Sequence, residues 1–398
     1  MAISDLHMCG VTQDGRLWHT LRSVQGTVAS WSPWEQVKGP GPFINIDCVR
    51  VAQPGSQGND NPPLEFHILG VTQDGKLWHT VSTVAHQWHS FEDFGARIGG
   101  NWGAFQRVRA AQLHGKLHVC AIVLTAQGQR HILHTVRDTN GKWSSFEDAT
   151  RPELASFPGS FVNVDCTGLW DSTEELHVCG VTDDGKLWHT INCDNPPWLP
   201  FINVQVMSSN IPGSISTVSI AIPSELLHVC VQAHGDLWHT TRSSDIPPSW
   251  QPAFDAIKNK AGNPGAFGSI SCADIGGELH LCGNTGDGKV WHTRFSSAGN
   301  ASGWQPFESV KAGNNPGPMY HISITGEPPT TGPQGEDPHC APIQIQMGND
   351  ISAMQGLQSQ LASTTNTATI NQLNVQIAGL QQAIAVLQQQ AQQYNCPG

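Results

Sequence analysis

One segment of about 15 residues recurs six times along the chain, and this repeat restricts the possible folds more than any other feature. The best-preserved copy, residues 176–190, reads Leu-His-Val-Cys-Gly-Val-Thr-Asp-Asp-Gly-Lys-Leu-Trp-His-Thr. Two apolar runs around an Asp-Gly dipeptide predict a β-hairpin with a two-residue type I′ turn. The other copies are residues 6–20, 66–80, 117–135, 227–240 and 279–293.

Each hairpin is followed by a variable loop, a second tryptophan with an aromatic residue close behind it, and a Gly/Pro-rich turn that leads into a further alternating strand. These second tryptophans are Trp31, Trp88, Trp143, Trp198, Trp250 and Trp304. Four short strands that recur every 50 to 60 residues are typical of β-propeller blades.

The two ends of the repeat region indicate how the propeller closes. The chain starts at the second strand of a unit, residues 6–12, and the sixth unit is followed by an extra first strand, residues 319–325. Pairing these two strands would complete the first blade and remove the exposed sheet edges of an open array. We therefore expect an all-β, six-bladed propeller of four-stranded antiparallel blades over residues 1–325, with an open solenoid as the alternative.

The remainder of the chain differs in composition. Residues 326–342 are rich in Pro and Gly and predict a linker, whereas residues 343–398 form a Gln-rich tail. Apolar residues of the tail repeat at heptad spacing, which predicts helices. Two arrangements remain open: a coiled coil that forms a homo-oligomer through residues 351–395, or a self-folded helical hairpin. The hairpin would bring Cys340 and Cys396 within reach of a disulfide.

Charge and hydropathy exclude several partners. The formal net charge of −12 disfavours nucleic acid and anionic membrane surfaces, which attract basic proteins. No run of about 18 apolar residues is present, so we expect no membrane insertion. The N-terminal residues lack the basic and apolar regions of a secretory signal. We expect a soluble protein that is cytoplasmic or exported by a non-classical route.

Histidine is concentrated at two positions of the repeat, near the start of the hairpin and in the Trp-His-Thr sequence. With a two-residue turn, His7 and His19 would point to opposite faces of the blade, so no single blade would hold a metal ion between them. No His-x-His pair or His-Glu-x-x-His motif is present. We expect these histidines to bridge neighbouring blades, and we expect no metal or cofactor.

Most of the cysteines also fall at equivalent repeat positions, where small apolar side chains between blades are the expected role. Catalysis finds little support in the sequence. Propeller sialidases need a tyrosine nucleophile, and Tyr320 is the only tyrosine of the repeat region. We therefore expect no enzyme.

Trp beside His, Asp and Thr instead suits sugar binding, because sugar C–H faces stack on aromatic rings while polar groups bind the hydroxyls. Core packing between blades is the competing role of these tryptophans, and we expect it for most of them.

The repeat, with its Asp-Gly turn, Leu-Trp-His and downstream Trp, resembles that of PLL-type bacterial fucose-binding propeller lectins and, more loosely, of tectonin-type lectins. The resemblance covers residues 1–325 and implies repeated sugar sites without catalysis. This chain has six units instead of seven, its third unit lacks both Asp-Gly and the tryptophan, and its fifth has His-Gly at the turn. The residues that the resemblance marks as sugar contacts are Trp18, His19, Trp78, His79, Trp188, His189, Trp291 and His292.

Two functions follow from the sequence. The first is a multivalent, non-enzymatic lectin whose partners are glycans or glycoconjugates. The second is a structural or protein-interaction propeller that its helical tail docks onto a larger assembly.

Overall fold

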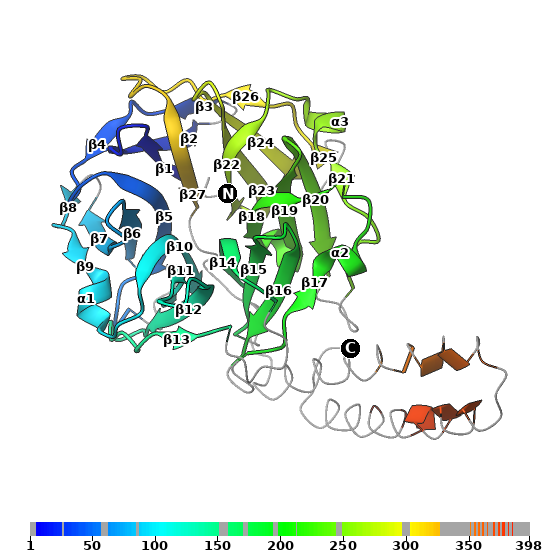
Figure 1. Cartoon of the computed structure of the whole chain (residues 1–398). Helices are drawn as coiled ribbons and strands as arrows, with labels where there is room; N and C mark the ends of the chain where they lie inside the picture. Colours follow the sequence, from blue (N-terminus) through cyan, green and yellow to red (C-terminus); the bar gives the residue numbers. More distant parts are fainter. Residues whose placement is uncertain are drawn as a thin grey trace.

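The computed structural model describes residues 5–25, 28–56, 63–84, 87–150, 158–169, 174–193, 198–211, 213–243, 249–296 and 303–326, together with scattered positions between 351 and 384. Six antiparallel sheets surround a common axis as the blades of a propeller (Figure 1). The prediction of a six-bladed all-β propeller is confirmed.

In each blade the first strand faces the axis and the last strand lies at the rim. The first blade consists of β27 (Met319–Thr325), β1 (Leu6–Thr12), β2 (Leu17–Gln25), β3 (Val28–Trp31) and β4 (Glu35–Val37). The second consists of β5 (Phe43–Ala52), β6 (Leu64–Thr72), β7 (Leu77–Val84), β8 (Gln87–Trp88) and β9 (Glu92–Asp93). The third consists of β10 (Ala104–Leu113), β11 (Lys116–Leu124), β12 (Arg130–Arg137) and β13 (Glu147–Asp148).

The other three blades follow the same order. The fourth consists of β14 (Phe161–Gly168), β15 (Leu176–Thr182), β16 (Leu187–Asn192) and β17 (Ile202–Asn203). The fifth consists of β18 (Ile215–Ala221), β19 (Leu227–Ala233), β20 (Asp236–Arg242) and β21 (Asp255–Ala256). The sixth consists of β22 (Phe267–Ile275), β23 (Glu278–Thr285), β24 (Val290–Ser296), β25 (Gly303–Trp304) and β26 (Glu308–Ser309). Three short helices, α1 (Phe94–Ile98), α2 (Val204–Met207) and α3 (Lys258–Ala261), and the 3₁₀ turn η2 (Pro223–Glu225) lie in the connections.

The propeller closes as the sequence predicts. Strand β27 pairs antiparallel with β1, and Cys9 lies opposite Ser323 in this pairing. The first blade therefore takes its inner strand from the far end of the repeat region, as Figure 1 shows for the yellow β27 beside the dark blue β1. Adjacent inner strands contact one another all the way round, from β5 to β27 and back to β5.

The hydrophobic core is divided into six clusters, and each cluster lies between two neighbouring blades. Between the first and second blades, for example, Val11 and Leu17 pack with Phe43 and Ile68. The other five interfaces are filled in the same way. Because both faces of each blade are buried against a neighbour, the strands carry apolar residues on both sides.

Around the axis, polar side chains of one inner strand accept hydrogen bonds from backbone N–H groups of the next. Asp47 Oδ2 accepts from the N–H of Ala110 at 2.6 Å. The equivalent pairs are Asn45–Val108 (2.7 Å), Asp165–Ile220 (2.9 Å), Ser219–Cys272 (2.8 Å), Ser271–Ile324 (3.0 Å) and Ser323–Cys48 (3.1 Å). These bonds satisfy buried backbone donors that would otherwise be costly.

The tail contributes only scattered described positions, most of them helical, of which Leu373, Ile377 and Ile384 are buried. The linker prediction for residues 327–342 and the proposed Cys340–Cys396 pair lie outside the described residues. Whether the tail oligomerises or folds back on itself stays a prediction.

Candidate functional site

The turn between the second and third strands of a blade carries a repeated network of hydrogen bonds around a tryptophan. In the second blade, Trp78 Nε1 donates to Thr72 Oγ1 at 2.9 Å, and this hydroxyl donates to Asp74 Oδ1 at 2.6 Å. The indole N–H is thus satisfied inside the turn, while the ring is only half-buried. The turn therefore presents the indole surface of Trp78 beside the carboxylate of Asp74.

The same network recurs in two further blades. Trp188 donates to Thr182 at 3.1 Å and Trp291 to Thr285 at 3.2 Å. In the first blade the Thr12–Asp14 bond is also 2.6 Å, but the buried Nε1 atom of Trp18 has no hydrogen-bond partner among the described residues. All four predicted tryptophans are half-buried, so each retains an accessible part.

A pocket of about 450 Å³ opens beside one of these tryptophans. Trp78 and the turn residues Thr72, Gln73 and Asp74 form one wall, and the loop of residues 40–42 forms the other. The two walls are joined by a hydrogen bond from the N–H of Gln73 to the carbonyl oxygen of Pro42, at 3.1 Å. The pocket therefore combines an aromatic ring with an amide and a carboxylate at its rim.

The histidine that follows each tryptophan has a different environment. His19, His79, His189 and His292 are only 2 to 6 % exposed. In every blade this histidine accepts or donates a hydrogen bond through Nε2 to Nδ1 of the histidine at the start of the hairpin. The distances are 3.0 Å (His7–His19), 2.9 Å (His67–His79), 3.1 Å (His118–His134), 3.0 Å (His177–His189), 2.9 Å (His228–His239) and 3.0 Å (His280–His292).

This pairing corrects the expectation that the two histidines of a blade point to opposite faces. Three residues, 13–15, join the strands, because the N–H of Thr12 bonds to the carbonyl of Arg16 and that of Gly15 to the carbonyl of Thr12. Gly15 has a φ of 78°, whereas Asp14 is not among the residues with positive φ, so the turn is not type I′. The extra residue reverses the side-chain alternation and brings His7 and His19 onto one face.

The fifth blade also shows that the length of the turn determines the spacing of the two histidines. Its turn has two residues, His234 and Gly235, both with positive φ, between the paired residues Ala233 and Asp236. The spacing between its histidines is correspondingly one residue shorter, and His228 still meets His239. Hairpin length and histidine spacing therefore change together.

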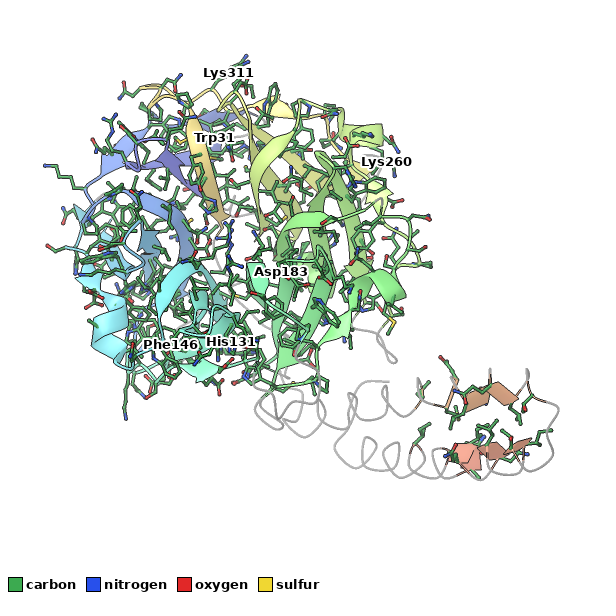
Figure 2. All side chains as sticks on the ribbon, in the orientation of Figure 1. Trp31, His131, Phe146, Asp183, Lys260 and Lys311 are labelled. Carbon is green, nitrogen blue, oxygen red and sulfur yellow. The ribbon has the colours of Figure 1, made fainter. Side chains whose placement is uncertain are left out.

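The histidine of the third strand also contacts the second tryptophan of the next blade, which confirms that these histidines bridge blades. Each contact is edge-to-face, with interplanar angles between 73° and 89°. The ring centroids are separated by 5.9 Å (His19–Trp88), 5.9 Å (His79–Trp143), 5.3 Å (His134–Trp198), 5.4 Å (His189–Trp250), 5.3 Å (His239–Trp304) and 6.1 Å (His292–Trp31). Trp31 lies where the first and sixth blades meet (Figure 2).

Burial lowers the pKa of several histidines at the start of the hairpin. It lowers the pKa of His67 and of His228 to about 4 and that of His280 to about 3. In the second blade, Glu92 Oε1 accepts from His79 Nδ1 at 3.1 Å, and Nε2 of that ring is hydrogen-bonded to His67 Nδ1. Each predicted histidine is thus buried and bonded through Nε2 to a second histidine, and its role as a sugar contact stays a prediction.

A second pocket, of about 250 Å³, was not found from the sequence. It lies between the second and third blades, beside the His79–Trp143 contact. Arg97 donates to Glu92, and Arg137 donates to Glu65 Oε2 at 2.7 Å. The hydrogen bond from His79 is the largest of the favourable contacts that lower the pKa of Glu92, against a smaller opposing effect of burial. The pocket is thus lined by two arginines, the Glu92 carboxylate and Trp143.

The sequence offered little signal for this pocket because Arg97 lies in the variable α1 segment and not in the repeat. Among the described residues no group of three or more His, Cys, Asp or Glu side chains could hold a metal ion. The described helices are all too short or too polar to cross a membrane.

Comparison with known proteins bears on the fold. No protein-family model matches the chain, and no curated protein matches its sequence. A mutant of the Aleuria aurantia lectin AAL in complex with Fucalpha1-6GlcNAc has a TM-score of 0.52 and 15% identity, over 79% of this chain and 98% of that chain. The fucose-specific lectin from Aleuria aurantia in a mercury-derivative form gives 0.52 and 15%, over 78% and 92%.

A third structure of the Aleuria aurantia lectin, described as a six-bladed β-propeller with a novel fucose recognition mode, has a TM-score of 0.50 and 14% identity, over 79% of this chain and 98% of that chain. At these identities the likeness concerns the architecture. The chain therefore has the six-bladed β-propeller fold that is known from a fungal lectin.

Proposed function

We propose that this protein is a non-enzymatic, carbohydrate-binding propeller in which a sugar ring stacks on the tryptophan of the Thr-x-Asp-Gly turn. The observation that carries the proposal is the pocket beside Trp78, where a half-buried indole faces the loop of residues 40–42. A site of this size accommodates a mono- or disaccharide, and its mixed aromatic and polar walls suit sugar C–H faces and hydroxyls.

The polar groups of the turn supply the hydroxyl contacts. The Asp74 carboxylate accepts from Thr72, and this hydrogen bond is the largest cause of its lowered pKa, so the group stays ionised at neutral pH. A carboxylate is an acceptor that binds sugar hydroxyls strongly. The Gln73 side chain adds an amide donor and acceptor at the same rim.

In this proposal, Trp18, Trp78, Trp188 and Trp291 are the sugar contacts. His19, His79, His189 and His292 hold the strand that carries each tryptophan, because they are buried and bonded to a second histidine. Repeated sites make the protein multivalent, and several weak sites that bind one glycan surface together raise the overall affinity by orders of magnitude. Fucosylated glycans are the first ligands to test, since the Aleuria aurantia lectin of the same fold is fucose-specific.

The pocket between the second and third blades is the second candidate sugar site. Trp143 supplies an aromatic wall, while Arg97 and Glu92 supply a donor and an acceptor. The lectin proposal holds if either pocket binds a sugar. Substitutions in each pocket show which of the two does so.

The test measures binding of the full chain to a glycan array that includes fucosylated oligosaccharides, followed by calorimetry with the best ligand. We expect Trp78→Ala to lower affinity at its site roughly 10- to 100-fold. Trp238→Ala is the matched control: this tryptophan occupies the same position in the fifth blade, whose turn lacks the Thr and Asp.

The variants Arg97→Ala and Trp143→Phe report on the second pocket. Loss of affinity in these variants, with Trp78→Ala unchanged, would move the site to the interface between blades. If the folded full chain binds no glycan on any array at high protein concentration, the lectin proposal is overturned. This result would favour a protein-interaction propeller that docks through its tail.

A further inference from the structure

Six buried cysteines of the propeller form three facing pairs, and each pair spans two neighbouring blades. The two side chains of each pair pack in the same cluster between blades, and all six are free thiols with at most 8 % exposure. The pairs are Cys9 with Cys48, Cys120 with Cys166, and Cys230 with Cys272.

The backbone fixes the approach of the first pair. Ser323 lies directly opposite Cys9 in the β27–β1 pairing. Its hydroxyl Oγ accepts from the N–H of Cys48 at 3.1 Å and lies 3.3 Å from Cys48 Sγ. One serine of the first blade therefore ties the backbone of Cys48, in the second blade, beside Cys9.

The same geometry recurs in the fifth blade. Ser219 lies opposite Cys230 in the β18–β19 pairing, and its Oγ accepts from the N–H of Cys272 in the sixth blade at 2.8 Å. For the remaining pair a charged contact replaces the serine. Arg109 lies opposite Cys120, and its Nε is 3.5 Å from Oδ1 of Asp165, which directly precedes Cys166.

The three pairs occupy alternate interfaces of the ring: first to second, third to fourth, and fifth to sixth blade. At the equivalent positions of the other three interfaces, one side or both is a different residue. The register places Leu69 and Ala110, Cys179 and Ile220, and Cys282 and Ile324 there. Apolar filling needs no sulfur at these positions, as Leu69 and Ala110 show, so the pairing of thiols at every second interface calls for a separate explanation.

We propose that these pairs are sites of three disulfide bonds between blades, formed by exchange with a low-molecular-weight disulfide such as oxidised glutathione. One cysteine thiolate attacks the small disulfide, which releases one small thiol and leaves a mixed disulfide on the protein. The facing cysteine then attacks this mixed disulfide, forms the bond between blades and releases the second small thiol. Each bridge thus reduces one small disulfide to two small thiols, which carry the two protons.

The surroundings indicate when the exchange occurs. Burial raises the pKa of the Cys9 thiol well above its ordinary value, and a hydrogen bond to Cys120 and burial do the same for Cys166, so few thiolates exist in the closed blade interface. A cavity of about 120 Å³ at the axis is lined by Cys48, Cys166 and Cys272, but it is too small for a glutathione molecule. Exchange is therefore expected while the blades are still apart, during folding.

The test refolds the full chain with either oxidised or reduced glutathione, alkylates free thiols in denaturant, and maps the cross-linked peptides by mass spectrometry. We expect the oxidised sample to lose six alkylatable thiols within the propeller and to show the pairs 9–48, 120–166 and 230–272. Cys179 and Cys282, whose facing positions hold Ile220 and Ile324, stay alkylatable and serve as internal controls. The oxidised protein is expected to unfold at a higher temperature, and dithiothreitol is expected to reverse this shift.

A matched pair of variants makes the result specific. Cys48→Ala should remove the 9–48 cross-link and leave the other two, whereas Cys179→Ala should leave all three. If the six paired cysteines all stay free after oxidative refolding to the native propeller, or if cross-links join other cysteines, the proposal is overturned.

Discussion

The imidazole ring of His292 meets the indole ring of Trp31 edge-on, with ring centroids 6.1 Å apart and planes inclined by 78°. This contact joins the sixth blade to the first, and five equivalent contacts join the remaining neighbours. The interface at which the ring closes is therefore built like the other five, although its first blade combines strands from both ends of the repeat region.

Replacement of the closing tryptophan tests this equivalence. We expect Trp31→Ala to lower the free energy of unfolding by about 2 kcal/mol, since a half-buried indole and an aromatic contact are lost. Trp88→Ala, which removes the His19 contact between the first and second blades, should cost about as much. Urea denaturation compares the two variants, and a markedly larger or negligible effect of Trp31→Ala would contradict equivalence of the interfaces.

The buried histidines predict a loss of stability in acid. Nine histidines have lowered pKa values in the folded protein. In the unfolded chain these histidines are protonated below about pH 6.5. In the folded protein, His67 and His228 are protonated only near pH 4. Stability should therefore fall as the pH drops through this window, by up to ~1.4 kcal/mol per pH unit for each group.

The buried Asp47 and Asp165 and the half-buried Asp274 oppose this effect, because desolvation raises their pKa values, that of Asp47 to about 6. They favour the folded state as the pH falls, but the histidines outnumber them. Thermal unfolding midpoints measured from pH 7.5 to 4.5 check the sign, with a flatter profile expected for His280→Asn. A stability that stays level across this range would show that the histidine pairs are protonated in the folded state.

Two glycines at the same turn position separate conformational strain from crowding. Gly288 and Gly128 have φ values of 76° and 78°, so alanine is strained at both. A Cβ at Gly288 would lie 2.2 Å from Cβ of Pro318, whereas a Cβ at Gly128 would meet nothing within 4 Å. We expect Gly128→Ala to cost about 1 kcal/mol and Gly288→Ala more than about 3 kcal/mol. Chemical denaturation measures both, and equal losses would mean that the turn does not need close contact with the loop before β27.

The hydrogen-bonded ring around the axis predicts a large effect of a single carboxylate. Asp47→Ala removes the acceptor of the Ala110 N–H and of the Ser323 hydroxyl, and it leaves both buried donors unpaired. We expect a loss of about 3 kcal/mol. Asp14→Ala, at an exposed turn, should cost less than about 1 kcal/mol. If both variants unfold at the same urea concentration, the inner ring is not a main source of stability.

The sequence was sufficient to predict the ring, the number of blades and the closing strand, because each depends on counting repeats. The histidine pairs could not be predicted because the turn of the hairpin is one residue longer than the Asp-Gly dipeptide indicates. An Asp-Gly dipeptide fits both a two-residue and a three-residue turn, and only the register decides which faces the histidines share. The shorter spacing between His228 and His239 in the fifth unit was the available signal.

The candidate sites also differ in whether their residues belong to the repeat. The tryptophan beside the Thr-x-Asp turn could be identified because it repeats, and the structure adds its bond to Thr72 and the opposing loop. Arg97 and Glu92 could not be paired from the sequence, since α1 belongs to one blade only. The thiol pairs could not be predicted from the repeat, because the two cysteines of each pair, such as Cys9 and Cys48, lie in successive units.

The position of β27 in the chain has a consequence for synthesis. A ribosome makes β1 first and its neighbour in the sheet more than 300 residues later, so the edge of β1 stays unpaired while the intervening five blades emerge. An unpaired edge is a site where chains associate wrongly. Nascent chains that stop short of residue 319 would therefore carry this edge permanently, which makes the last strand of the ring the step that separates a finished molecule from an aggregation-prone one.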